Sequence, residues 1–158
     1  VEVIRRPEEL GRHDASMNAV IARALSVLNG EHFLQIHTTS PLLTPTTIDK
    51  KIETWVRSEQ HDSAFGVSRL QARLWTAEAE PINHTLDHLL PTQDLDPVFL
   101  ENSALYLFTR TSFLQTGNRI GVRPLLLEIP NIEAVDIDTE EDFALAQALQ
   151  IGLRGGIS

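Results

Sequence analysis

The alternation of apolar strand-like runs with amphipathic helical stretches is the feature that most constrains the fold of this chain. An apolar face with three- and four-residue spacing predicts a helix over 17–28, and the run 32–37 reads as a strand. Thr44 is placed to cap a second amphipathic helix over 45–56, and a further strand follows over 62–68. Strands and helices that alternate in this way predict an α/β domain with βαβ units and a mostly parallel sheet.

The stretch 69–97 departs from this pattern. It has no long helical periodicity, and it mixes tryptophan, histidine and proline with polar residues. An extension of this kind within a domain is usually functional or covered by a partner, so we expect a hairpin-like arm. Regular structure returns with strands over 104–108 and 124–129 and a final helix over 143–151.

Length and charge restrict the partners that this chain can bind. A chain of 158 residues fits one domain, and a domain of this size buries roughly 70% of its unfolded surface. The formal charge of −9, without a basic run to meet phosphate, argues against nucleic acid or a membrane surface as a partner. The chain has no cysteine, which excludes disulfides and thiolate catalysis and agrees with the cytoplasmic location that we expect. No apolar run approaches the length of a membrane span.

Two carboxylates near the end of the chain, Asp136 and Asp138, are candidates for a metal site. In an extended backbone, residues i and i+2 point to the same side, so both side chains would face one spot. Mg²⁺ prefers oxygen ligands and is typically held by one or two carboxylates together with substrate phosphates. The alternative is structural, because Asp138 is also placed to cap the following helix. The spacing alone leaves both interpretations open.

A series of short segments, spread in order over nearly the whole chain, carries a family resemblance. The segments are 6–10 (RPEEL), 14–18 (DASMN), 35–43 (QIHTTSPLL), 69–73 (RLQAR), 92–95 (TQDL), 101–106 (ENSALY), 118–121 (NRIG) and 134–138 (AVDID). Each is weak alone. As an ordered set they resemble the CMP-sugar synthetases for nine-carbon acidic sugars, the acylneuraminate cytidylyltransferases.

The resemblance implies an enzyme that transfers CMP from CTP to the anomeric hydroxyl of an acylneuraminate-like 2-keto sugar acid and releases pyrophosphate. It also implies a three-layer Rossmann-like nucleotidyltransferase fold, with 1–158 as a single domain. The stretch 69–97 would be a dimerisation arm that packs on the neighbour in a homodimer and helps close its sugar pocket. Asp136 and Asp138 match the metal-binding pair of the family, so we expect them to be catalytic with Mg²⁺ or another divalent cation.

The resemblance also assigns ligand-binding roles. A guanidinium fork such as that of Arg73 suits a sugar carboxylate, and a side-chain amide such as that of Gln71 suits an acyl group. Each of these residues also has a structural alternative. Arg73 and Gln71 would be solvated arm residues, His37 would have a structural role at the end of a strand, and Tyr106 would belong to the core. The implied ligand set is His37, Thr39 and Ser40 for the nucleotide, and Gln71, Arg73, Gln93, Asn102 and Tyr106 for the sugar acid.

Two departures from the family pattern leave alternatives open. Pro91 and Leu100 stand where relatives often carry polar or charged residues near the sugar. The Gly-rich loop that cradles the CTP phosphates has no counterpart and would precede Val1, so we expect the chain to be an N-terminally truncated part of such a synthetase. The alternative functions are CMP activation of a related 2-keto sugar acid (of the Kdo, legionaminic or pseudaminic type) and a non-catalytic dimerising module.

Overall fold

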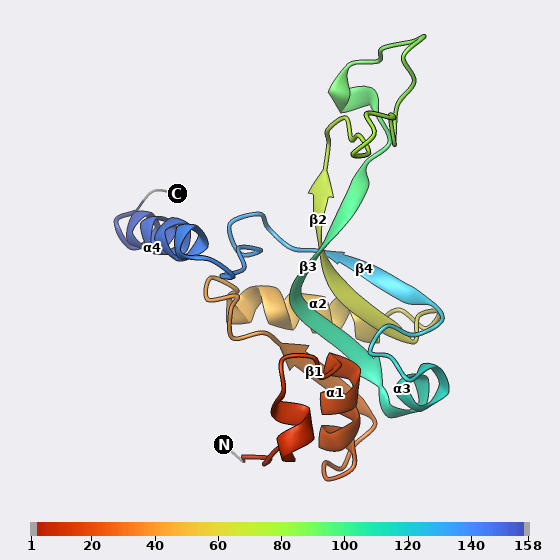
Figure 1. Ribbon diagram of the computed structural model, residues 1–158, viewed down its shortest axis with the longest axis vertical. Helices are drawn as coiled ribbons and strands as arrows, with labels where there is room; N and C mark the ends of the chain where they lie inside the picture. Colours follow the sequence, from red (N-terminus) through yellow and green to blue (C-terminus); the bar gives the residue numbers. More distant parts are fainter. Residues whose placement is uncertain (1–2, 157–158) are drawn as a thin grey trace.

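The computed structural model describes residues 3–156 and is built around a four-stranded sheet in the order β1-β3-β2-β4 (Figure 1). The strands are β1 (His32–Ile36), β2 (Ser63–Leu70), β3 (Val98–Thr109) and β4 (Pro124–Glu128). β3 runs antiparallel to both of its neighbours, and β2 and β4 are parallel. β1, β2 and β4 therefore share one direction, and β3 is reversed. The expected α/β class is confirmed.

The sheet is mixed, and this corrects the expectation of a mostly parallel sheet. The helix at 45–56 carries the chain from β1 to β2, and these two strands do share a direction. The connection from β2 to β3 has no crossover helix, and a parallel neighbour would require one. The chain instead leaves through the arm and returns beside β2. β3 is thus inserted between β1 and β2 with the opposite direction.

Helices pack on both faces of the sheet (Figure 1). The packed helices are α1 (Met17–Leu25), α2 (Pro45–Val56) and α3 (Arg110–Thr116), and a further helix, α4 (Glu140–Arg154), follows the sheet in the chain. On one face, Ile21 of α1 and Phe113 of α3 join Tyr106 and Phe108 in a buried cluster. On the other face, Trp55 of α2 packs in a second cluster with side chains from β2, β3 and β4, namely Ala64, Ala104, Leu105, Leu107 and Leu127.

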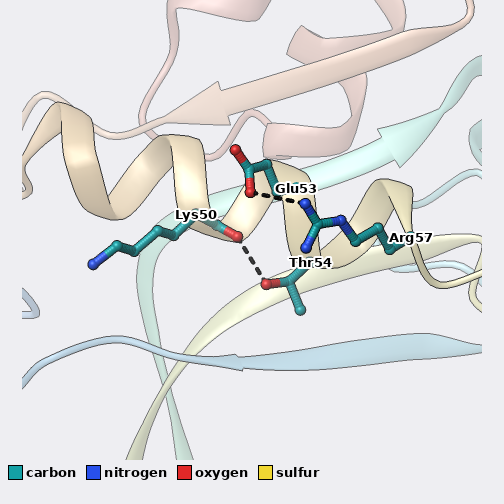
Figure 2. Close-up of polar contacts among 4 residues, drawn as sticks. All are labelled: Lys50, Glu53, Thr54 and Arg57. Atoms are coloured by element: carbon teal, nitrogen blue, oxygen red, sulfur yellow. Dashed lines mark hydrogen bonds and ion pairs between the residues drawn. The ribbon is translucent and has the colours of Figure 1, made fainter.

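The start of α2 has the predicted cap, since the Thr44 side chain accepts a hydrogen bond from the Thr47 N–H at 3.2 Å. Figure 2 shows polar contacts along α2: an exposed Glu53–Arg57 ion pair at 3.4 Å, and the Thr54 hydroxyl donating to the Lys50 carbonyl at 2.7 Å. An exposed pair of this kind contributes roughly 0.3–0.5 kcal/mol. The position of α2 therefore depends mainly on the burial of its apolar face.

Two parts of the chain extend from this body (Figure 1). The arm rises from the ends of β2 and β3. Helix α4 stands at the side, and Ala146 is the one buried residue among its described positions. None of the helices within residues 3–156 has the length and apolar character needed to cross a membrane.

Candidate functional site

The segment that carries Asp136 and Asp138 lies against the turn that follows β1. The N–H of Ile137 donates to the carbonyl of Thr39 at 2.9 Å. The predicted metal-binding pair and the predicted nucleotide-binding turn are therefore neighbours at the carboxyl end of β1. This is the end of a strand at which α/β proteins commonly bind ligands.

Two buried oxygen atoms at this junction have no hydrogen-bond partner among the described residues. They are the Oγ of Ser40 and the Oδ1 of Asp136. Buried polar atoms in folded proteins are almost always hydrogen-bonded to protein or to ordered water, so these two oxygens are free to bind water, a ligand or a cation. The two atoms come from the predicted nucleotide turn and the predicted metal pair, respectively.

The carboxylate of Asp138 is not the cap of α4. The cap is Thr139, whose hydroxyl accepts from the N–H of Asp142 at 3.2 Å while the Asp142 carboxylate accepts from the N–H of Thr139 at 2.9 Å. The hydrogen bond from the hydroxyl of Thr139, followed by those from the N–H groups of Thr139 and Asp138, holds the pKa of Asp142 below its ordinary value. The side chain of Asp138 is exposed and is left free of this capping box.

A divalent cation fits this junction only if a ligand completes its coordination. Asp136 and Asp138 lie in irregular backbone between a turn and the start of α4. Within residues 3–156, no group of three or more His, Asp or Glu side chains is arranged to hold a metal ion. The unpaired Oδ1 of Asp136 suits a hard cation, which would take its remaining ligands from a bound phosphate and water.

A polar cluster surrounds the ring of Tyr106 next to this junction. Arg119, from the loop between α3 and β4, stacks on the ring with its Cζ 3.5 Å from the ring centroid. Its Nη1 donates to Gln35 Oε1 at 3.1 Å and lies 3.4 Å from His37 Nε2. His37 immediately precedes the nucleotide turn, so we refer to this cluster and the Asp136 junction together as the polar region.

The hydroxyl of Tyr106 donates to the carboxylate of Glu101 and lies 3.2 Å from the Oγ of Ser103. Burial of the phenol and the hydrogen bond to Glu101 raise the pKa of Tyr106, while Ser103 and Arg119 act in the opposite direction. The phenol therefore stays protonated at neutral pH and acts as a donor. Its ring is fully buried, so it is also a core residue.

Two cavities flank this polar region. The larger, of about 410 Å³, lies between α1 and the end of β1, and its lining includes Arg6, Met17, Gln35, His37 and Thr39. The smaller, of about 230 Å³, is lined by residues of the Arg119 loop, the start of α1 and Glu101. The cavities thus border the polar region at His37 and Thr39 and at Arg119, and neither of the two is lined by Asp136 or Asp138.

The predicted sugar-binding residues are not gathered at this region within one chain. Gln71 and Arg73 lie in the arm, where they bind the backbone of its returning half. The Nε2 of Gln71 donates to the carbonyls of Thr92 and Leu95 at 2.9 and 2.6 Å, and the Nη2 of Arg73 donates to the carbonyl of Leu90 at 2.5 Å. These side chains hold the arm closed and are not solvated arm residues.

The remaining predicted residues are divided between the arm and the body. Gln93 is exposed on the arm. Asn102 is buried on β3, donates to the Ser68 hydroxyl at 3.1 Å and packs over Gly66, where an added Cβ would come within 2.6 Å of its Oδ1. Of the implied sugar set, Tyr106 alone contacts the polar region described above.

Arg119, Gln35 and Glu101 belong to this region, and we expected no role for any of them from the sequence. Each of them lies in a segment that carries the family resemblance, and this was the signal that could have identified them as site residues. Their contacts could not be predicted, because these depend on strand pairing and on the loop before β4.

A comparison of the chain with models of protein families finds no match.

Proposed function

We propose that this chain acts as a nucleotidyltransferase that transfers CMP from CTP to the anomeric hydroxyl of an acylneuraminate-like 2-keto sugar acid. The observation that carries this proposal is the 2.9 Å hydrogen bond from Ile137 to Thr39, because it joins the two segments that such a reaction needs. One supplies hydroxyls and backbone groups for the nucleotide, and the other supplies paired carboxylates.

In this proposal, Thr39 and Ser40 bind ribose or phosphate oxygens of the nucleotide, with the unpaired Ser40 hydroxyl as one donor. His37 would contact the nucleotide from the strand end. Asp136 and Asp138 would hold Mg²⁺, which when bound stabilises the charge that develops on the phosphate oxygens. Tyr106, which is buried and donates its hydroxyl hydrogen to Glu101, would frame the acceptor indirectly by holding that carboxylate in place.

The proposal includes a three-layer Rossmann-like nucleotidyltransferase fold and a homodimer. The arm exposes large apolar side chains that its own chain leaves uncovered: Trp75 is 46% exposed, Ile82 58% and Leu89 63%. Exposed apolar groups that gather on one protruding element are typical of an interface. Packing the arm on a neighbour would bring Gln71, Arg73 and Gln93 towards the partner's site, which explains why one chain does not gather the sugar-binding set.

Pyrophosphate release tests the proposed function. The chain is incubated with CTP, Mg²⁺ and a panel of 2-keto sugar acids that includes acylneuraminate, Kdo, legionaminic and pseudaminic types. We expect turnover with an acylneuraminate-like acid when the Gly-rich phosphate loop of the family is fused ahead of Val1, and loss of that turnover when EDTA removes the metal. Turnover with another acid alone would change the substrate. The absence of turnover with every acid, in both the unmodified chain and the fused version, would favour the non-catalytic dimerising module.

Asp138→Asn tests the metal pair. We expect metal-dependent turnover to fall by about 100-fold or more, because a cation at this position stabilises the transition state by several kcal/mol. Stability should change by no more than about 0.5 kcal/mol, because the carboxylate is exposed and outside the capping box. Glu141→Gln, which neutralises a nearby exposed carboxylate in the first turn of α4, is the control and should keep its turnover.

A further inference from the structure

Arg119 is a cation in the polar region that has no carboxylate partner in the part of the chain that the structure describes. Its guanidinium stacks on Tyr106 and donates through Nη1 to Gln35. Among residues 3–156, no ion pair to Arg119 is formed, and its Nε and Nη2 have no hydrogen-bond partner. A guanidinium with free donors suits an oxyanion, because its planar fork matches the geometry of a carboxylate or a phosphate.

The loop that carries Arg119 is held in place before any ligand binds. The N–H of Arg119 lies 3.4 Å from Asn18 Oδ1, and the N–H of Gly121 donates to the Ser63 hydroxyl at 2.8 Å. The ring of Tyr106, which is buried, supports the guanidinium from below. A ligand would therefore meet a preorganised cation and would lose little affinity to the ordering of this side chain.

The cavity of about 230 Å³ beside Arg119 also contains a hydrogen-bond acceptor, the carboxylate of Glu101. This carboxylate accepts from the Tyr106 hydroxyl and makes no ion pair with Arg119. It would repel an anion that has no hydrogen to donate. An acid with hydroxyl groups can instead place its carboxylate at Arg119 and donate a hydroxyl to Glu101.

We infer that Arg119 and Glu101 bind the carboxylate end of a polyhydroxylated acid. The inference rests on the proposed function, in which this acid is the acceptor sugar acid. It assigns the sugar carboxylate to Arg119 on the body of the chain and not to Arg73, which lies in the arm and binds the backbone of its returning half there. Inorganic phosphate, the other oxyanion that a guanidinium binds, carries up to two negative charges at neutral pH and is therefore repelled by Glu101 more strongly than a single carboxylate.

Calorimetric titration of the full chain with N-acetylneuraminate, and separately with inorganic phosphate, tests this site in the absence of CTP. Arg119→Gln should lower the affinity for N-acetylneuraminate by about tenfold or more, as expected for the loss of a charge-assisted pair. Arg119→Lys keeps the charge but loses the fork, so its loss should be intermediate. Arg123→Gln removes the same charge from an exposed position in the same loop and should leave the affinity unchanged.

Glu101→Gln provides a second and opposite readout. It should weaken binding of N-acetylneuraminate and strengthen binding of inorganic phosphate, because the repelling charge is removed. The inference is wrong if the unmodified chain binds no sugar acid, if Arg119→Gln and Arg123→Gln lose equal affinity, or if Glu101→Gln leaves phosphate binding unchanged.

The two proposals fail in different ways. If the chain binds N-acetylneuraminate through Arg119 but releases no pyrophosphate from CTP, with or without the fused loop, the proposed function is refuted and the site stands. If pyrophosphate is released and the KM for the sugar acid is the same in Arg119→Gln as in the unmodified chain, the function stands and the Arg119 site is refuted.

Discussion

At the scale of single residues, Asp62 shows how one carboxylate positions a whole loop. Its carboxylate accepts from the N–H groups of Val122 and Arg123, both at 3.0 Å, and Gly121 lies so close that an added Cβ would overlap it. Burial raises the pKa of Asp62, but the N–H groups of Arg123 and Val122 and the Ser63 hydroxyl outweigh burial, and the pKa is lowered. The loop so held is the one that presents Arg119.

We predict that Asp62→Ala lowers the free energy of unfolding by about 2 kcal/mol at neutral pH, because two backbone N–H groups lose a charged acceptor. The folded-state pKa lies below the unfolded value of about 3.9, so the contribution is complete above that value and disappears as pH falls through the folded pKa. Urea unfolding at neutral pH and at about pH 2.5 measures the difference, which should shrink in acid. Asp87→Ala removes an exposed carboxylate and is the control, so its free energy of unfolding should match that of the unmodified chain. A loss of stability in Asp62→Ala that is the same at both pH values would contradict this account.

At the scale of elements, the arm is closed by side chains that reach backbone carbonyls across it. Gln71 on the outgoing half binds Thr92 and Leu95, and the amide of Asn83 donates to the carbonyl of Ala72 at 2.8 Å. A backbone bridge between Trp75 and Pro81 adds to these bonds. A long segment without regular secondary structure is thereby given a defined shape, which an interface requires.

We predict that Gln71→Ala loosens the arm without unfolding the body, because it removes two hydrogen bonds to the returning half. Hydrogen exchange followed by mass spectrometry should show faster exchange over 90–97 and unchanged exchange in β1. Gln93→Ala removes the same side chain from an exposed position of the same arm and should exchange like the unmodified chain. Equal acceleration in both variants would show that Gln71 does not hold the arm.

At the scale of the whole molecule, the arm and α4 both extend from a body with two separate cores (Figure 1). Both elements expose large apolar side chains, which on α4 include Phe143, Leu145 and Ile151. Both the arm and α4 are therefore candidates for the interface of an assembly. The proposed function requires the arm, since the arm carries residues that the site of a single chain lacks.

We predict that the chain is a dimer joined through the arm. Size-exclusion chromatography with light scattering should give twice the mass of the 17.7 kDa chain. The double variant Ile82→Ser and Leu89→Ser should shift the mass to that of a monomer, because it removes exposed apolar area from the arm. Leu145→Ser makes a comparable change on α4 and should remain dimeric; the reverse pattern, or a monomer before any substitution, would refute the arm interface.

Much of the local structure could be predicted from the sequence alone. The apolar periodicity placed most helices and strands close to where they are found, and Thr44 caps α2 as its position before Pro45 suggested. The exception is β3, which begins at Val98 although the prediction began at 104. Apolar spacing and capping depend on residues within a few positions of each other. The metal-binding role of Asp136 and Asp138 and the roles of the sugar-binding residues stay predictions, because a short sequence pattern is compatible with several structures.

Tertiary structure alone decided the strand order, the polar region and the use of the arm residues. β3 lies between β1 and β2, so Gln35 pairs with Tyr106, and the loop before β4 brings Arg119 onto that ring. Gln71 and Arg73 are occupied by backbone carbonyls that the returning half of the arm supplies. These contacts join residues far apart in the chain, and their energies depend on which strands pair, which the local apolar pattern does not encode.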